Sequence, residues 1–281
     1  MLKRIVLFVF LVVSSCAVFS QKDEIILISW NIKDFGKTKN QEELNDIANI
    51  VKDADIVAIQ EVVAGYGGAQ AVAKLSDALN RKGSKWDYAI SNPTNSPKYV
   101  TERYAFLWKT GRVKIKNRGW LITELDRAID REPFLLNFYI GNKKLTLVNF
   151  HSRPYNKDPE SEIKALSNFS IDSLSPPLII AGDFNVDERK PIFDILKSKG
   201  YAPAIINQKT TLKRACKRVE YLNYPIDNIF YSNGIEKLEG GVIDFVRFCD
   251  RLERARKLSD HLPVFLKFKM EWSLYEKYTN R

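Results

Sequence analysis

The chain has only two histidines, and each stands beside residues that could transfer protons or bind a metal. His151 directly follows an apolar run, and His261 ends the sequence Ser259-Asp260-His261. The unperturbed pKa of imidazole, about 6.5, lies near working pH, so a histidine can both accept and donate a proton. A single histidine at the end of a strand is more often structural. The similar surroundings of both histidines favour a chemical role.

Oxygen-bearing side chains follow other apolar runs in the same way. Asn31 follows residues 25–30, Glu61 follows residues 56–59, and Asp183 and Asn185 follow residues 178–181. Polar residues at the same ends of neighbouring strands converge on one surface. Hard oxygen ligands suit Mg²⁺, with Ca²⁺ or Mn²⁺ as alternatives, and no histidine and cysteine spacing suggests zinc. A divalent ion at such a site could polarise a phosphoryl oxygen.

Asp227 is unusual because it lies within the apolar run at residues 225–231. A carboxylate buried among strand neighbours must be paired or must bind a metal, since an isolated buried charge is strongly unfavourable. Asp227 is therefore a candidate partner for one of the polar groups above.

The segments that must position these residues have sequence patterns typical of both strands and helices. Short runs rich in Ile, Val, Leu and Phe predict buried strands, and longer amphipathic stretches predict helices. Strand candidates between residues 104 and 150 follow one another without helices, which favours antiparallel pairing there. We predict an α/β fold in which mixed sheets pack together with helices outside. The predicted strands cover residues 25–30, 56–59, 104–108, 134–140, 145–150, 178–181, 226–231 and 262–268, and the predicted helices cover residues 42–52, 69–79, 160–174 and 192–199.

The N-terminus resembles a secretory leader, because Lys3 and Arg4 precede an apolar run that ends in small residues. We predict a signal peptide over residues 1–20 and a single catalytic domain over residues 21–281. The protein would then be secreted or periplasmic. The alternative is a lipoprotein anchored through Cys16, which stands in a lipobox-like sequence. No later run is long enough for a transmembrane segment.

The net charge and the cysteines bear on the possible partners and on a possible disulfide. The formal net charge is +10, which favours polyanionic partners but also fits simple solubility. Cys216 and Cys249 form an even pair, so the sequence leaves a disulfide open. Two basic clusters stand out, and either could bind a polyanion or form a solvated face. They comprise Lys213, Arg214, Lys217 and Arg218 in one case and Arg251, Arg254, Arg256 and Lys257 in the other.

Several short motifs follow one another in an order that a known superfamily shares. The chain resembles the endonuclease, exonuclease and phosphatase superfamily, and within it the deoxyribonuclease I branch. This resemblance implies a four-layer α/β/β/α sandwich of two packed mixed β-sheets flanked by helices. The motifs are residues 29–38, residues 55–61, Glu102-Arg103-Tyr104, Arg131-Glu132-Pro133, His151-Ser152 with Pro154, residues 182–185, Asp227 and Ser259-Asp260-His261.

The resemblance also implies roles for individual residues. Glu102 would orient His151 and Asp227 would orient His261, and the two imidazoles would share the proton transfers. Arg131 would contact a backbone phosphate, with Asn31 and Asn185 also binding substrate. The implied enzyme is a metal-dependent endonuclease that cuts DNA with little sequence specificity, as a monomer without an obligate protein partner. The implied metal ligands are Glu61, Asp260, Asn31, Asp183 and Asn185.

Two departures from the family pattern leave alternatives open. Val63 stands where related nucleases carry an arginine that reaches into the minor groove, and Val100 stands where a tyrosine often contacts DNA. The same chemistry could therefore act on a phospholipid or inositol phosphate. A non-catalytic DNA-binding homologue is the third reading, although the full set of acidic residues and histidines argues against it.

Overall fold

The structure is a computed structural model in which residues 23–97 and 99–271 are described. The predicted signal peptide and Cys16 lie outside the described residues. Two large β-sheets dominate this part of the chain. The first consists of β14 (Ile235–Val242), β15 (Val264–Met270), β1 (Glu24–Phe35), β2 (Ile56–Val63), β4 (Glu102–Lys109) and β3 (Trp86–Ile90), in that order. The second consists of β10 (Ala202–Pro203), β13 (Asp227–Tyr231), β9 (Leu178–Asp183), β8 (Lys143–His151), β7 (Phe134–Ile140) and β5 (Lys114–Ile115), with β6 (Trp120–Leu121) also paired to β7.

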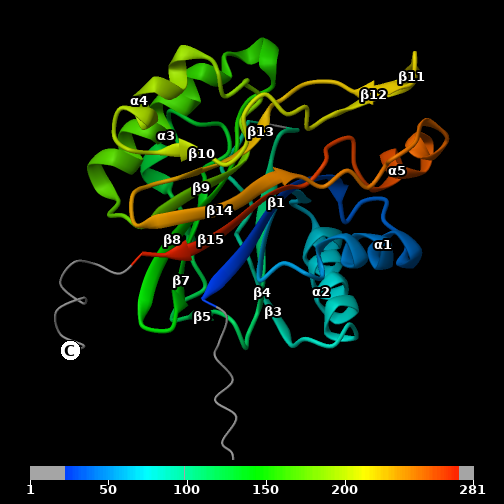
Figure 1. Ribbon diagram of the computed structural model, residues 1–281, viewed down its shortest axis with the longest axis horizontal. Helices are drawn as coiled ribbons and strands as arrows, with labels where there is room; N and C mark the ends of the chain where they lie inside the picture. The colour runs from blue at the N-terminus through cyan, green and yellow to red at the C-terminus, as the bar shows by residue number, and fades with distance from the viewer. Residues whose placement is uncertain (1–22, 98, 272–281) are drawn as a thin grey trace, which may run out of the picture.

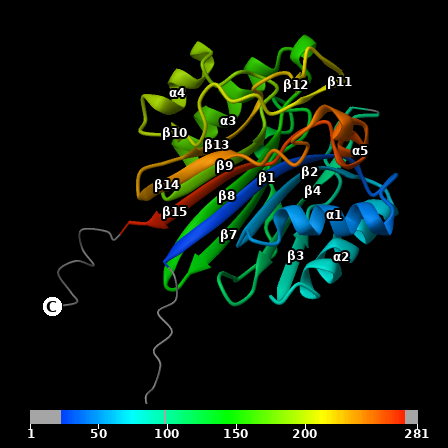
Figure 2. The same ribbon diagram turned by 45° about the vertical axis from the view of Figure 1, so that its right-hand side comes forward.

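Both sheets are mixed, because β1 pairs with β2 and β8 pairs with β9 in parallel while their other pairings are antiparallel. Helices α1 (Gln41–Val51) and α2 (Tyr66–Asn80) cover the outer face of the first sheet. Helices α3 (Pro159–Ser173) and α4 (Asp194–Lys197) cover the outer face of the second. Figures 1 and 2 show the resulting four layers. The predicted fold class is confirmed.

The core between the sheets explains why they pack face to face. Alternate residues of each strand point inward, as the period of two in an extended chain requires. Phe106 of the first sheet packs against Phe134 and Phe138 of the second, with ring centroids 5.4 and 5.6 Å apart. All three rings are fully buried. Aromatic contacts of this kind fix the spacing and the relative orientation of the two sheets.

Helix α1 begins at a capping box formed by Asn40 and Glu43. Asn40 accepts a hydrogen bond from the backbone N–H of Glu43, and the Glu43 side chain accepts one from the backbone N–H of Asn40. This reciprocal capping satisfies two backbone donors that a helix N-terminus leaves free. No helix among the described residues is both long enough and apolar enough to cross a membrane.

Several element boundaries differ from the prediction. Strand β1 continues to Phe35 and β2 to Val63, because the two strands keep pairing beyond a bulge after Asn31. The helix predicted over residues 192–199 is instead a 3₁₀ turn, η3 (Pro191–Phe193), followed by the short α4. The sequence reading missed other elements, namely β3, β5, β6, β10, β14, the hairpin of β11 (Leu212–Lys217) and β12 (Glu220–Leu222), α5 (Leu252–Leu258), η1 (Thr123–Leu125), η2 (Tyr155–Lys157) and η4 (Cys249–Arg251).

A buried polar pair joins the two sheets directly. The amide of Gln60, on β2, donates to Asn149 Oδ1, on β8, at 2.6 Å. Asn149 in turn donates to the backbone carbonyls of Ile59 and Ala105 at 3.1 and 3.2 Å. Both side chains are fully buried. Most buried polar groups are hydrogen-bonded, and although Gln60 Oε1 has no partner among the described residues, the bonds of this pair favour one alignment of the sheets along their strands.

We expect Asn149→Ala to lower the free energy of unfolding by roughly 2–4 kcal/mol, because it leaves buried polar groups without partners and also creates a small cavity. Chemical denaturation monitored by circular dichroism measures this change. The matched control is Asn142→Ala in the exposed turn before β8. Equal stability of the two variants would contradict the proposed link between the sheets.

Candidate active site

The register of three neighbouring strands brings the first part of the site together. His151, the last residue of β8, pairs with Asp183 at the end of β9, and Asp183 pairs with Asp227 at the start of β13. The three side chains therefore come from one row across the second sheet. Gly182 permits this row, because a Cβ added there would lie 1.8 Å from the carbonyl oxygen of Phe150.

His151 is held by a carboxylate of the opposite sheet. Its Nδ1 lies 2.9 Å from Glu102 Oε1 and 3.1 Å from Oε2. The guanidinium of Arg131 lies 3.8 Å from the same carboxylate and also donates to the backbone carbonyls of His151 and Ser152. All of these side chains are buried. Glu102 and Arg131 thus fix the orientation of the imidazole.

His261 has a matching arrangement. Its Nδ1 lies 3.0 and 2.9 Å from the two carboxylate oxygens of Asp227. Thr210 Oγ1 donates to Asp227 Oδ2 at 2.6 Å. On the other side, Ser259 Oγ accepts from the backbone N–H of His261 at 3.0 Å and donates to the carbonyl of Asn31 at 2.6 Å. These contacts leave little freedom to the ring.

The remaining ring nitrogens of the two histidines point to one place. His151 Nε2 lies 3.5 Å and His261 Nε2 lies 3.7 Å from the same oxygen, Asp183 Oδ2. The side-chain amide of Asn31 donates to that oxygen at 3.1 Å and to Glu61 Oε1 at 2.9 Å. Residues of both sheets and of the segment before β15, far apart in sequence, therefore meet around the carboxylate of Asp183.

The surroundings of the two histidines affect their protonation in opposite ways. Burial lowers the pKa of His151 to about 4, and the positive charge of Arg131 acts in the same direction. Burial alone would lower the pKa of His261 as well, but the carboxylates of Asp227 and Asp183 outweigh it and raise the pKa to about 10. The two imidazoles therefore differ in how readily they take up a proton, His261 far more readily than His151.

The acids of the site have raised pKa values. Burial raises the pKa of Glu102 to about 7, although the nearby Arg131 opposes the rise. Burial, followed by repulsion from Asp227, raises the pKa of Asp183. Perturbed pKa values of several groups in one place are typical of functional sites.

A metal ion fits this set of donors. Asp183, Asp227 and His261 each offer a ligand atom within 4.8 Å of the others. The side-chain oxygen of Asn31 is buried and has no hydrogen-bond partner among the described residues, although it stands beside Glu61 and Asp183. An oxygen atom that is buried without a donor can be satisfied by a cation. Carboxylate and amide oxygens are the ligands that Mg²⁺, Ca²⁺ and Mn²⁺ prefer.

Other predicted site residues lie around this centre in different ways. Asn185, with φ of 51°, donates from its side chain to the carbonyl of Ser152 at 3.3 Å. The carboxylate of Asp260 is paired with Lys33 at 3.5 Å and with Arg256 at 3.6 Å. Within the described chain, Asp260 makes no hydrogen bond to the other predicted metal ligands. The phosphate contact of Arg131 stays a prediction, since its guanidinium is buried against Glu102.

Sequence reasoning missed one functional neighbour entirely. Thr210 supports Asp227, but it precedes a hairpin that no apolar pattern indicated. A polar segment that follows a predicted helix gives no signal of this contact, because the hydrogen bond spans 17 residues and depends on the tertiary fold.

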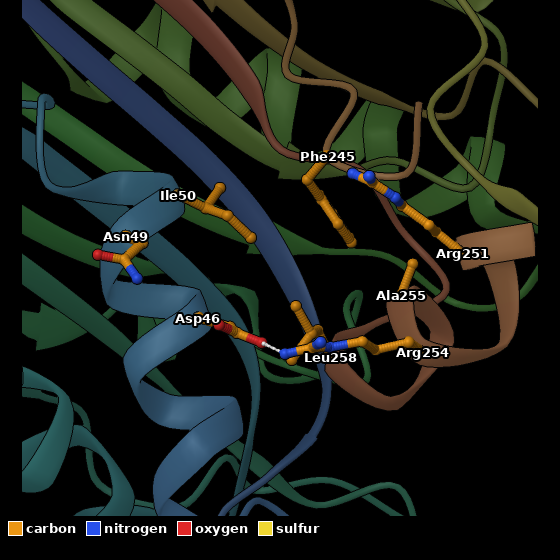
Figure 3. Close-up of a pocket in the computed structure, with 8 residues that line it drawn as sticks. All are labelled: Asp46, Asn49, Ile50, Phe245, Arg251, Arg254, Ala255 and Leu258. Atoms are coloured by element: carbon orange, nitrogen blue, oxygen red, sulfur yellow. Dashed lines mark hydrogen bonds and ion pairs between the residues drawn. The ribbon is translucent and has the colours of Figure 1, made fainter. Parts of the chain in front are cut away.

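A separate hollow of about 540 Å³ lies between α1 and α5. Arg254 points toward α1 and pairs with Asp46 at 3.0 Å (Figure 3). It also pairs with Glu42 at 2.9 Å. None of the predicted site residues line this hollow. The convergence of ionisable groups, and not the volume of the hollow, identifies the candidate active site.

The sequence over residues 28–261 matches the Endonuclease/Exonuclease/phosphatase family. The chain belongs to this family. The superfamily recognised from the ordered motifs is thereby confirmed. Both histidines and the acids that hold them lie within the matched residues.

Individual relatives of the Endonuclease/Exonuclease/phosphatase family agree with this assignment. Deoxyribonuclease-1 of Oryctolagus cuniculus is 29% identical over 175 residues, which cover 57% of this chain and 60% of that protein. The chain thus matches less than two thirds of the length of this relative. The similarity to deoxyribonuclease-1 is confined to these 175 residues.

Solved structures show the same fold. A family protein from Bacteroides thetaiotaomicron has a TM-score of 0.63 at 16% identity and covers 89% of this chain and 98% of its own. A conserved protein from Enterococcus faecalis has a TM-score of 0.64 at 14% identity, with 88% and 100% covered. A humanized D. rerio TDP2 has a TM-score of 0.58 at 16% identity, with 88% and 100% covered.

The donor set leads to a prediction about metal binding. Mg²⁺ or Mn²⁺ at about 100 times its Kd should stabilise the protein by roughly 2.7 kcal/mol, because the ion binds only the folded state. We expect Glu61→Gln to remove most of the resulting rise in melting temperature, and calorimetry with and without the ion measures it. Glu124→Gln, at an exposed position in η1, is the control. A rise of the same size in both variants would argue against Glu61 as a ligand.

Proposed function

We propose that this protein is a divalent-metal-dependent endonuclease that hydrolyses DNA phosphodiester bonds with little sequence specificity. The observation that carries the proposal is the convergence of two imidazoles, each supported by a carboxylate at Nδ1, on one oxygen of Asp183. Two such groups suit a reaction that removes one proton and delivers another. The partial match to a deoxyribonuclease supports DNA as the substrate.

The residues would divide the reaction as follows. One imidazole accepts a proton from the attacking water, and the other donates a proton to the leaving 3′ oxygen. Water adds in line to phosphorus while the P–O3′ bond breaks, which leaves a 5′-phosphate and a 3′-hydroxyl. Glu102 and Asp227 hold the two rings in position. Glu61, Asp183, Asn31 and Asn185 would bind the metal and the phosphate, and the metal would neutralise charge that develops on the phosphoryl oxygens.

An exported location is part of the proposal. The disulfide between Cys216 and Cys249, which the sequence left open, is present in the structure. Disulfides persist mainly in oxidising compartments, so the bond is compatible with export. The leader-like N-terminus points the same way.

Plasmid nicking tests the catalytic proposal. We expect wild-type protein to convert supercoiled plasmid to open circles with Mg²⁺ and to stop when the ion is chelated. His151→Ala and His261→Ala should each lower the rate by about 10²–10⁴-fold, because each removes one proton-transfer group. Lys144→Gln, at an exposed position on β8, is the control and should nick at the wild-type rate.

The same experiment separates the alternatives. Nicking that survives either histidine substitution, with folding verified by circular dichroism, would refute the mechanism. Hydrolysis of sphingomyelin or phosphoinositides without cleavage of plasmid would replace DNA with a lipid substrate. Binding of DNA without turnover in Mg²⁺ would leave a non-catalytic homologue.

A further inference from the structure

The hairpin of β11 and β12 starts directly at the candidate active site. Thr211, which precedes the hairpin, forms a β-bridge with His261, and the backbone N–H of Leu212 donates to the carbonyl of Asp260 at 2.8 Å. Next to it, Thr210 donates to Asp227 Oδ2 at 2.6 Å. The base of the hairpin is therefore attached to the segment that holds the second histidine.

The hairpin is also fastened to the rest of the protein away from its base. The Cys216–Cys249 disulfide links the far part of β11 to η4, immediately before α5. The hydroxyl of Tyr221, on β12, donates to the carboxylate of Asp244. Leu212 lies in a small apolar cluster with residues of α5. Figure 1 shows β11 and β12 extending outward beside α5. These fastenings give a projecting element a defined position.

The tip of the hairpin has a strained backbone. Arg218 and Val219, the two residues between the strands, have φ of 52° and 65°. A two-residue hairpin turn of type I′ requires positive φ at both central positions, and Asn-Gly is a preferred sequence there. A β-branched valine is strongly disfavoured in this region. Both side chains are exposed, so no burial in this part of the chain offsets the strain.

Most basic side chains of the hairpin are exposed and unpaired within the part of the chain that the structure describes, unlike those of the second basic cluster. Arg214, Lys217 and Arg218 are exposed, and their side chains form no ion pair with the described residues. Lys213, in contrast, pairs with Glu220 at 3.1 Å. The hairpin therefore offers three cations to the solvent.

The second basic cluster is largely occupied by contacts within the fold. Arg254 pairs with Glu42 and Asp46, and Arg256 pairs with Asp260 and donates to the carbonyl of Leu212. Arg251 stacks over Phe248 at 5.5 Å. These cations stabilise α5 and the base of the hairpin, so the cluster is largely structural.

We propose that the β11–β12 hairpin is an arm that binds nucleic-acid backbone phosphates through Arg214, Lys217 and Arg218, away from the bond that is cut. The proposal rests on the proposed function, because the arm serves the same site. From Leu212 to Lys217 the strand extends about 17 Å, at about 3.3 Å for each residue. A duplex rises about 3.4 Å for each base pair, so the arm can reach phosphates about five base pairs from the cleaved bond.

Two triple variants test the arm. The first replaces Arg214, Lys217 and Arg218 with Gln. The control replaces Lys85, Lys144 and Lys199 with Gln, which removes the same charge from exposed positions. The control residues lie toward the opposite ends of the sheets, since Lys85 precedes β3, Lys144 is near the start of β8 and Lys199 precedes β10.

Binding is measured by fluorescence anisotropy with a labelled 20-base-pair duplex in EDTA, which prevents metal-dependent cleavage. Each phosphate contact contributes about 0.9 to the slope of log K against log salt concentration. We expect the slope to fall in magnitude by about 2–3 in the hairpin variant and by less than 1 in the control. Equal slopes for the two variants would overturn the proposal.

A second measurement compares substrates in Mg²⁺. We expect the ratio of plasmid nicking to hydrolysis of bis(p-nitrophenyl) phosphate to fall about tenfold or more in the hairpin variant relative to the control. A parallel fall on both substrates would indicate damage to the catalytic site and would overturn the proposal. If the wild-type protein binds the duplex but nicks no plasmid, the proposed function fails, and the salt slopes still decide whether the hairpin binds DNA.

Discussion

The structure depends on the requirement that buried ionisable groups have partners. The carboxylate of Asp183 is almost wholly inaccessible, and the imidazole of His261 and the amide of Asn31 are its favourable partners, while Nε2 of His151 also faces it at 3.5 Å. The strand register supplies two of the surrounding groups, because His151 and Asp227 are the direct neighbours of Asp183 on either side. A slip of one residue in either strand would turn these side chains to the other face of the sheet. Correct pairing of the strands and assembly of the site are therefore one process.

The same requirement connects the two sheets. Asn31 and Glu61 belong to the first sheet, whereas Asp183 belongs to the second, so the site exists only where the sheets align correctly at that end. The Gln60–Asn149 pair lies behind the site and joins β2 to β8. Its hydrogen bonds join the sheets in the same alignment that brings Asn31 to Asp183. Interactions that stabilise the fold thus also determine the geometry of the candidate site.

The sequence predicted those features of the fold and the site that depend on local apolar patterns and on the order of motifs. Apolar runs located the central strands, and the family resemblance indicated which polar residues gather. The sequence could not predict the β11–β12 hairpin, because the strand residues of this element show no regular alternation of apolar and polar side chains. Nor could it predict that Asp260 pairs with Lys33 and Arg256, or that Thr210 supports Asp227, since these contacts come from the tertiary fold. Exposed and paired cations look alike in sequence.

The cations around the site have two different physical roles, set by their burial. Arg131 is buried beside Glu102, where its charge opposes the burial that raises the pKa of that carboxyl to about 7. Without this charge Glu102 would more readily hold a proton and would accept a weaker hydrogen bond from His151 Nδ1, because a neutral carboxyl group is a poorer acceptor than a carboxylate. That hydrogen bond selects the tautomer in which Nε2 is free to face Asp183. The exposed cations of the hairpin act through solvent over longer distances, so salt should weaken their effect far more than that of Arg131.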